Sequence, residues 1–249
     1  MNIAVCVCQV PDTASVIGYN DGAIDYSRVH EVMNPYDEYA LEEAVRLKEQ
    51  FDDSLVTVFF VAPESSKEVL RKALAKGADK AVLVSCSAVV SDPYQIAHLL
   101  SQALTDWYQA VLPDIVFCGK QSTDIQSAQV PAMLAEMLGI ASVNSISVLN
   151  VEESFLSVER QIEGGTEYID VQCPVVLSAD KGLNTPRNTS VRAVMDARKK
   201  TIDIVPASYH HEPFVLMTDV VPLERKKQCC MVSSENELIQ ILSRDHNVF

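Results

Sequence analysis

The strongest constraint on the fold is an alternation of short apolar runs with helical segments over the first 140 residues. Four nearly continuous apolar runs have the character of strands covered on both faces, at residues 2–10, 55–61, 81–84 and 115–118. The segments between and after them carry apolar residues at helical spacing, at 34–49, 65–77, 93–111 and 127–138. This order predicts βαβ units and therefore an α/β fold with a doubly wound, mostly parallel, Rossmann-like sheet.

The rhythm changes after Gly139. Strand-like runs then follow one another without helices, at 142–148, 155–162, 168–171 and 174–178. A break at Glu163-Gly164-Gly165-Thr166 favours a turn between antiparallel strands. We therefore expect antiparallel edge strands on the same sheet, within one nucleotide-binding domain over residues 1–205. A smaller hairpin is expected at Asn20-Asp21-Gly22.

Residues 206–249 carry scattered Val, Leu and Phe but no apolar stripe that would close a core, and they end in a short helix expected near 235–242. Such a segment needs another surface to pack on. We expect an extended C-terminal arm that packs on a partner subunit.

Composition excludes several classes of partner. A formal charge of −14 argues against nucleic acid, which rewards basic patches. No apolar run approaches the ~20 residues that cross a bilayer, so membrane insertion is not expected. A strand that begins at Asn2 leaves no room for a targeting segment, and we expect a cytoplasmic protein. The seven cysteines form no Cys-x-x-Cys pair, which predicts reduced thiols and no metal site.

The loop from Gly119 to Val130 follows the fourth predicted strand and precedes a helix, with Ser127 as one possible N-cap. Parallel sheets bind ligands at this edge, and free amides at a helix N-terminus suit a phosphate. The alternative is an ordinary surface loop. Right-handed crossovers bring the ends of the strands at Cys6 and Val61 to the same edge, together with the helix start at Asn34, and this favours a nucleotide cradle.

No motif for bond-breaking chemistry accompanies this loop. The sequence has no Gly-x-Gly-x-x-Gly, no P-loop and no Gly-x-Ser-x-Gly elbow. A nucleotide fold without a catalytic set indicates binding, or electron carriage by a cofactor that the protein only tunes. We expect no catalytic residue and an electron carrier rather than an enzyme.

Several stretches together resemble the β (small) subunit of the electron transfer flavoproteins. They are Val5 to Asp12, Met33 to Ala44, Gly77-Ala78-Asp79, Gly119-Lys120-Gln121, Val158 to Glu167 with Pro174-Val175-Val176, Asn184-x-Pro186-Arg187, and Arg198-Lys199-Lys200. The match extends over residues 1 to about 205 and is most specific from Val158 to Glu167 through Val176, which is close to the family's signature.

The resemblance implies a heterodimer with a larger α subunit that holds most of a redox-active FAD. The complex would accept electrons from dehydrogenases such as acyl-CoA dehydrogenases and pass them to a quinone reductase or another acceptor. The β subunit of most members binds AMP, and the electron-bifurcating members bind a second FAD there and oxidise NADH. The resemblance places the nucleotide contacts on Cys6, Asn34, Pro35, Tyr36, Asp37, Val61, Gly119, Lys120, Gln121, Ser122, Thr123, Asp124, Ile125, Gln126, Ser127, Ala128, Gln129 and Val130. It places partner docking on Arg187, Val191 and Met195, with Val191 as the apolar anchor.

Two departures bear on the cofactor. Cys8 stands where the family usually has lysine. Ile125-Gln126-Ser127 replaces the acidic and small residues of bifurcating members, which favours AMP over a second flavin. A bifurcating subunit, and a stand-alone adenine-nucleotide-binding regulatory protein of the same fold, remain the alternatives.

Overall fold

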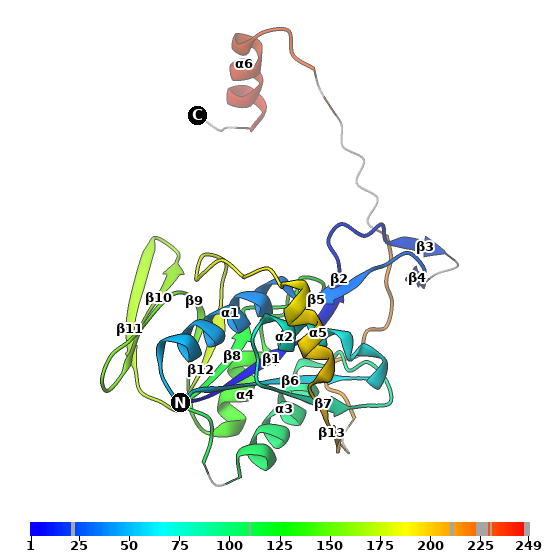
Figure 1. The fold of residues 1–249 in the computed structure, drawn as a ribbon. Helices are drawn as coiled ribbons and strands as arrows, with labels where there is room; N and C mark the ends of the chain where they lie inside the picture. The colour runs from blue at the N-terminus through cyan, green and yellow to red at the C-terminus, as the bar shows by residue number, and fades with distance from the viewer. Residues whose placement is uncertain (21–22, 110, 210–211, 223–228, 230, 247–249) are drawn as a thin grey trace.

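The computed structural model describes residues 1–20, 23–109, 111–209, 212–222, 229 and 231–246. A nine-stranded sheet has the order β11-β10-β9-β12-β8-β1-β6-β7-β13. Its strands are β1 (Asn2–Val7), β6 (Leu55–Ala62), β7 (Lys80–Ser85), β8 (Ile115–Gly119), β9 (Ala141–Val151), β10 (Leu156–Ile162), β11 (Gly165–Val171), β12 (Val175–Ala179) and β13 (Asp203–Pro206). The predicted α/β fold with a doubly wound, mostly parallel sheet is confirmed (Figure 1).

Strand direction follows the sequence pattern. The pairs among β1, β6, β7, β8, β9, β12 and β13 are parallel, whereas β10 pairs antiparallel with both β9 and β11. The two-residue turn at Glu163–Gly164 joins β10 to β11, as the glycine pair predicts. The edge strand β13 was not predicted from the sequence.

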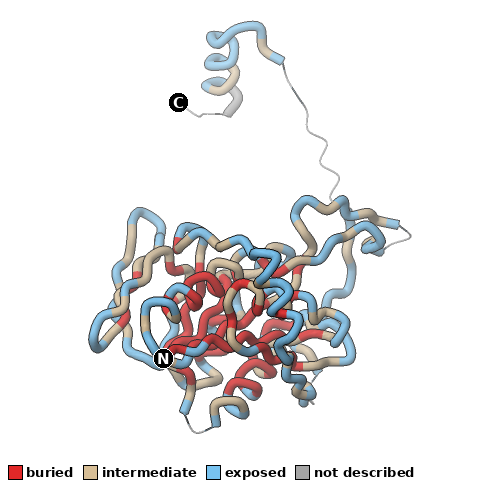
Figure 2. Tube along the Cα trace, viewed as in Figure 1, coloured by how far each residue is buried: buried red, intermediate tan, exposed pale blue. Residues whose placement is uncertain are grey.

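Helices cover both faces of the sheet. They are α1 (Pro35–Gln50), α2 (Glu68–Lys76), α3 (Pro93–Tyr108), α4 (Val130–Leu138) and α5 (Val191–Lys199), with a 3-10 turn η1 (Glu64–Ser66). Core residues of α1, α2 and α5 share one apolar cluster, and those of α3 and α4 share the other. Successive residues of β1 alternate between them, with Val5 facing α1 and Cys6 facing α3 and α4, because side chains alternate along a strand. The sheet and the inner helix faces form the buried layer in Figure 2.

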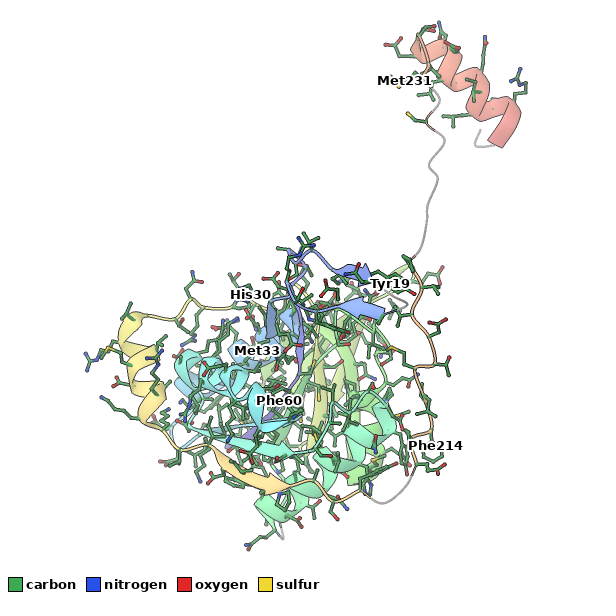
Figure 3. The ribbon with its side chains drawn as sticks, turned by 90° about the vertical axis from the view of Figure 1, so that its right-hand side faces the viewer. Tyr19, His30, Met33, Phe60, Phe214 and Met231 are labelled. Atoms are coloured by element: carbon green, nitrogen blue, oxygen red, sulfur yellow. The ribbon has the colours of Figure 1, made fainter. Side chains whose placement is uncertain are left out.

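The first strand is shorter than predicted. β1 ends at Val7, and the chain continues as β2 (Gln9–Pro11), which pairs antiparallel with β5 (Glu31–Met33). A separate hairpin pairs β3 (Gly18–Asn20) with β4 (Ala23–Asp25), while its expected turn residues 21 and 22 lie outside the described residues. Figure 3 shows Met33 and Phe60 inside the body and Tyr19 and His30 on the side that carries the hairpin.

The first residues of the C-terminal arm pack against the α/β domain. Ala207 donates its amide to the Ser85 carbonyl, and Phe214 donates its amide to Asp92 Oδ2 at 2.9 Å. The Phe214 ring also stacks edge-on against Tyr94, with centroids 4.8 Å apart. Helix α6 (Glu235–His246) lies away from the sheet in Figure 1. No helix in the described part of the chain is long and apolar enough to cross a membrane.

Candidate functional site

A cavity of about 180 Å³ opens where the strand order reverses, between the carboxyl ends of β1 and β8. From β1 the chain proceeds through β6 and β7 on one side and through β8 and β12 on the other, and open α/β sheets bind ligands at such a point. The predicted residues that line the cavity are Cys6, Asn34, Asp37, Gly119, Gln121, Ser122, Asp124, Ile125, Ser127, Ala128, Gln129 and Val130.

Asp37 connects three of the elements that border the cavity. Its carboxylate accepts the backbone amides of Cys8 at 2.7 Å and Gly119 at 3.0 Å, and it accepts the Asn34 side-chain amide at 2.9 Å. These contacts join the end of β1, the end of β8 and the start of α1. Burial raises the pKa of Asp37 to about 7, and the hydrogen bonds from Cys8, Asn34 and Gly119 oppose this rise. Asp37 is thus a structural joint of the site.

Asn34 connects this joint to the loop. It occupies the N-cap position of α1, but its side chain makes no capping hydrogen bond. Its Nδ2 donates instead to the Gln121 carbonyl at 2.9 Å and to Asp37. Its Oδ1 is buried and has no hydrogen-bond partner among the described residues. A buried acceptor without a partner costs about 1–3 kcal/mol, so this atom is suited to a ligand donor.

The loop backbone is suited to an anion. Gln126 and Ala128 have φ values of 57° and 54°, and Gln129 follows in the right-handed helical region. Left-handed and right-handed residues in succession form the nests that bind anions, and backbone strain at positive φ is typical of functional loops. Helix α4 starts at Val130, so the N-cap position falls on Gln129 and not on Ser127. Pro131 then lies in the first turn, where a missing N–H costs nothing.

The rest of the cavity lining is mostly apolar or carries thiols. It includes residues that the sequence reasoning missed, namely Val7, Cys8, Gln9, Val89, Val90, Ser91, Pro93, Ile96, Leu100, Cys118 and Pro131. Burial raises the pKa of Cys8, and the hydrogen bond with Cys6 followed by burial raises that of Cys118. Thiols held protonated in this way are poor nucleophiles, so these cysteines line the cavity without being reactive. The pairing of β1 with β8, which sets Cys6 opposite Cys118, was missing for Cys118, and the approach of residues 89–100 to this edge was missing for the others on α3 and before it.

Six predicted residues lie outside the cavity lining: Pro35, Tyr36, Val61, Lys120, Thr123 and Gln126. Val61 lies on β6, on the far side of β1, and packs against the cluster under α3 and α4. Lys120 turns away and pairs with Asp180 at 2.9 Å. Gln126 donates to the Thr123 carbonyl within the loop.

The three predicted docking residues separate into two kinds. Val191 and Met195 lie on α5 with 79% and 59% of their surface exposed. Arg187 turns inward instead, and its guanidinium binds Glu42 and Glu49 of α1. Ser190 caps α5 by accepting the Ala193 amide at 3.1 Å.

Comparisons with known proteins agree with this architecture. The family model described as "Electron transfer flavoprotein domain" matches residues 21–209. The "Electron transfer flavoprotein subunit beta" of Thermoanaerobacterium thermosaccharolyticum is 40% identical over 83% of this chain and 79% of its own length, and that of Bacillus subtilis is 35% identical over 82% and 78%. The "Caffeyl-CoA reductase-Etf complex subunit CarD" of Acetobacterium woodii is 34% identical over 90% and 83%. The sheet, the site at its switch point and these relatives together show that the chain belongs to the electron transfer flavoprotein family, as a member of its β-subunit branch.

Proposed function

We propose that the chain is the β subunit of a heterodimer that takes electrons from a dehydrogenase, such as an acyl-CoA dehydrogenase, and passes them to a quinone reductase or another acceptor. In this proposal its own cavity holds AMP and the larger α subunit holds FAD. The observation that carries the proposal is a recess at the β1–β8 switch point, lined by a polar loop and by apolar side chains. The family to which the chain belongs carries electrons, and the recess would serve that function.

The residues of the recess fit AMP. Val90, Ile96 and Leu100 offer an apolar surface for a base, and the loop from Gln126 to Gln129 offers an anion-binding backbone. The unpartnered Oδ1 of Asn34 can accept a hydrogen bond from an amino or hydroxyl group. A volume of about 180 Å³ lies below the ~300–1,000 Å³ of ordinary ligand pockets, which favours AMP over a second FAD.

FAD would supply the reversible electron acceptance in the assembled complex. The part of this chain would be to hold the nucleotide, to support the α subunit and to contact the dehydrogenase. Exposed Phe214, Val215, Leu216 and Met217 suit the arm to packing on the α subunit. The docking helix, defined here as α5 (Val191–Lys199), would place Val191 and Met195 in an apolar recess of the dehydrogenase.

Co-purification with the α subunit tests the proposal. The complex is examined by its visible absorption spectrum, and the nucleotides released on denaturation are identified and counted. One FAD and one AMP per heterodimer is the expected result. Two FAD and no AMP would overturn it in favour of a bifurcating subunit that oxidises NADH. A stable monomer that carries an adenine nucleotide but no flavin would overturn it in favour of a stand-alone regulatory protein.

A further inference from the structure

The docking helix is held to the body almost without apolar contact. Of its nine residues only Ala197 is buried. Figure 3 shows α5 at the outer surface of the body, and its anchor Val191 is 79% exposed. A helix of this length gains little stability from its own backbone hydrogen bonds, since most helical stability comes from packing. Other contacts must therefore fix its direction.

The first set of contacts lies just before the helix. Arg187 places Nε 2.9 Å from Glu42 Oε2 and Nη2 3.0 Å from Glu42 Oε1, and its Nη2 also lies 3.0 Å from Glu49 Oε2. Its backbone amide donates to Glu42 Oε2 at 3.0 Å, and its carbonyl accepts the Lys76 ammonium at 2.8 Å. The Glu42 side chain is only 8% exposed. Bidentate pairs of arginine with carboxylate fix geometry as well as charge.

The second set lies at the end of the helix. The Arg71 guanidinium donates to the Ala197 carbonyl at 2.8 Å and also to the Lys200 carbonyl. The Lys200 ammonium donates to the carbonyl of Ala78, two residues beyond the end of α2, at 2.7 Å. The last carbonyls of a helix have no partner within it, so Arg71 satisfies that of Ala197 from the neighbouring helix. Charged groups thus hold both ends of α5.

We propose that Arg187 is a positioning residue, which fixes the direction of the docking helix and contacts no partner itself. The bidentate pair with Glu42, together with Glu49, sets the entry of the chain into α5, and Arg71 holds its far end. The proposal rests on the docking role proposed for α5. It predicts that electron transfer from the dehydrogenase depends on a residue that lies behind the docking surface.

Amide hydrogen exchange on the assembled heterodimer tests directly whether Arg187 and Glu42 hold α5 in place. Arg187→Gln should accelerate exchange of residues 191–199 by about tenfold, which corresponds to ~1.4 kcal/mol of lost local stability. Glu42→Gln should have a similar effect, and Arg187→Lys should lie between, because lysine keeps the charge without the planar fork. Arg46→Gln is the matched control, since Arg46 is 53% exposed and pairs with Glu43 on its own helix. Unchanged exchange in Arg187→Gln and Glu42→Gln would overturn the proposal.

Kinetic measurements then distinguish the fixing of α5 by Arg187 from the docking of α5 on the dehydrogenase. With an acyl-CoA dehydrogenase that reduces the wild-type complex, Arg187→Gln should raise KM for the flavoprotein by about tenfold, with kcat and the flavin spectrum unchanged. Faster exchange with an unchanged KM would support the role of Arg187 in fixing α5 but would refute the docking role of α5. Loss of flavin or AMP in Arg187→Gln would show that Arg187 supports the whole subunit, which would overturn its assignment as a positioning residue.

Discussion

Gly119 offers a sharp test of how the site is built. It ends β8, and its amide donates to Asp37 Oδ1 at 3.0 Å. A Cβ at this position would lie 2.2 Å from that oxygen, 2.8 Å from Tyr36 Cβ and 2.9 Å from the Asp37 amide nitrogen. Two of these atoms belong to the backbone and side-chain stem of α1, so Gly119→Ala must displace the first turn of that helix.

The expected cost follows from two contributions. Overpacking of this kind costs about 1–3 kcal/mol, and weakened hydrogen bonds to a buried carboxylate cost about another 1–3 kcal/mol. We therefore expect Gly119→Ala to lower the free energy of unfolding by about 4 kcal/mol, the sum of the middle values of these two ranges. The variant should also lose AMP, because Asn34 and Gln121 would move with the helix.

Two other glycines serve as matched controls in guanidinium unfolding titrations. Added Cβ atoms at Gly164 and Gly165 meet nothing within 4 Å, and only Gly164 has a positive φ, of +85°. Gly165→Ala should therefore be nearly neutral, and Gly164→Ala should cost about 1 kcal/mol from backbone strain. A Gly119→Ala protein as stable as Gly165→Ala, with AMP retained, would refute the reasoning about the joint at Asp37.

Three further predictions follow from other contacts. Relative to Asp37→Asn, the wild-type unfolding free energy should fall by about 2.7 kcal/mol from pH 5 to pH 8, as two pKa units at ~1.36 kcal/mol imply. Burial raises the folded-state pKa of Asp37 to about 7, so its contribution is complete below the unfolded pKa and is lost as pH rises through 7. A flat difference in urea titrations would show that Asp37 stays ionised. Asp92→Ala should lower stability by about 1–3 kcal/mol and release the arm, because Asp92 caps α3 and accepts the Phe214 amide; unaltered proteolysis near Phe214 would contradict this. Val191→Ala should raise KM for the flavoprotein by up to about tenfold at constant flavin content, since it removes two methyl groups from an apolar contact; loss of flavin would show instead that the loop is structural.

The parallel sheet was predictable because strands buried on both faces leave an unmistakable apolar run. Strands with fewer neighbours were harder to predict from the sequence. β13 is an edge strand of four residues, paired only with β7, and no local pattern distinguishes Ile204 and Val205 from the irregular chain around them. β1 was overextended because Cys8 and Val10 continue the apolar run, although Val10 pairs with β5 in a separate ribbon.

The site was predictable as a loop but not as a cavity. The loop from Gly119 to Val130 follows a strand, and its polar composition identifies it from the sequence. Which other elements face it depends on strand order, which the sequence does not state. Val61 on β6 does not line the cavity, whereas Val90, between β7 and α3, and Ile96 on α3 do, although β7 lies beyond β6 in the sheet. Arg187 turns inward for a similar reason, since its partner Glu42 lies 145 residues away in the chain.

The central position of β1 has a consequence for how the protein folds. Residues 2–7 precede β6 and β8 in the sequence, yet they pair with both, and β8 is complete only at residue 119. Sheets with such distant pairings fold slowly, because loop closure must precede the gain from contacts. Since the cavity lies at the ends of β1 and β8, the nucleotide binding proposed for it would require this pairing to be complete. Acquisition of AMP during refolding should therefore report the closing of the central sheet, and its rate should follow the slowest β-sheet signal.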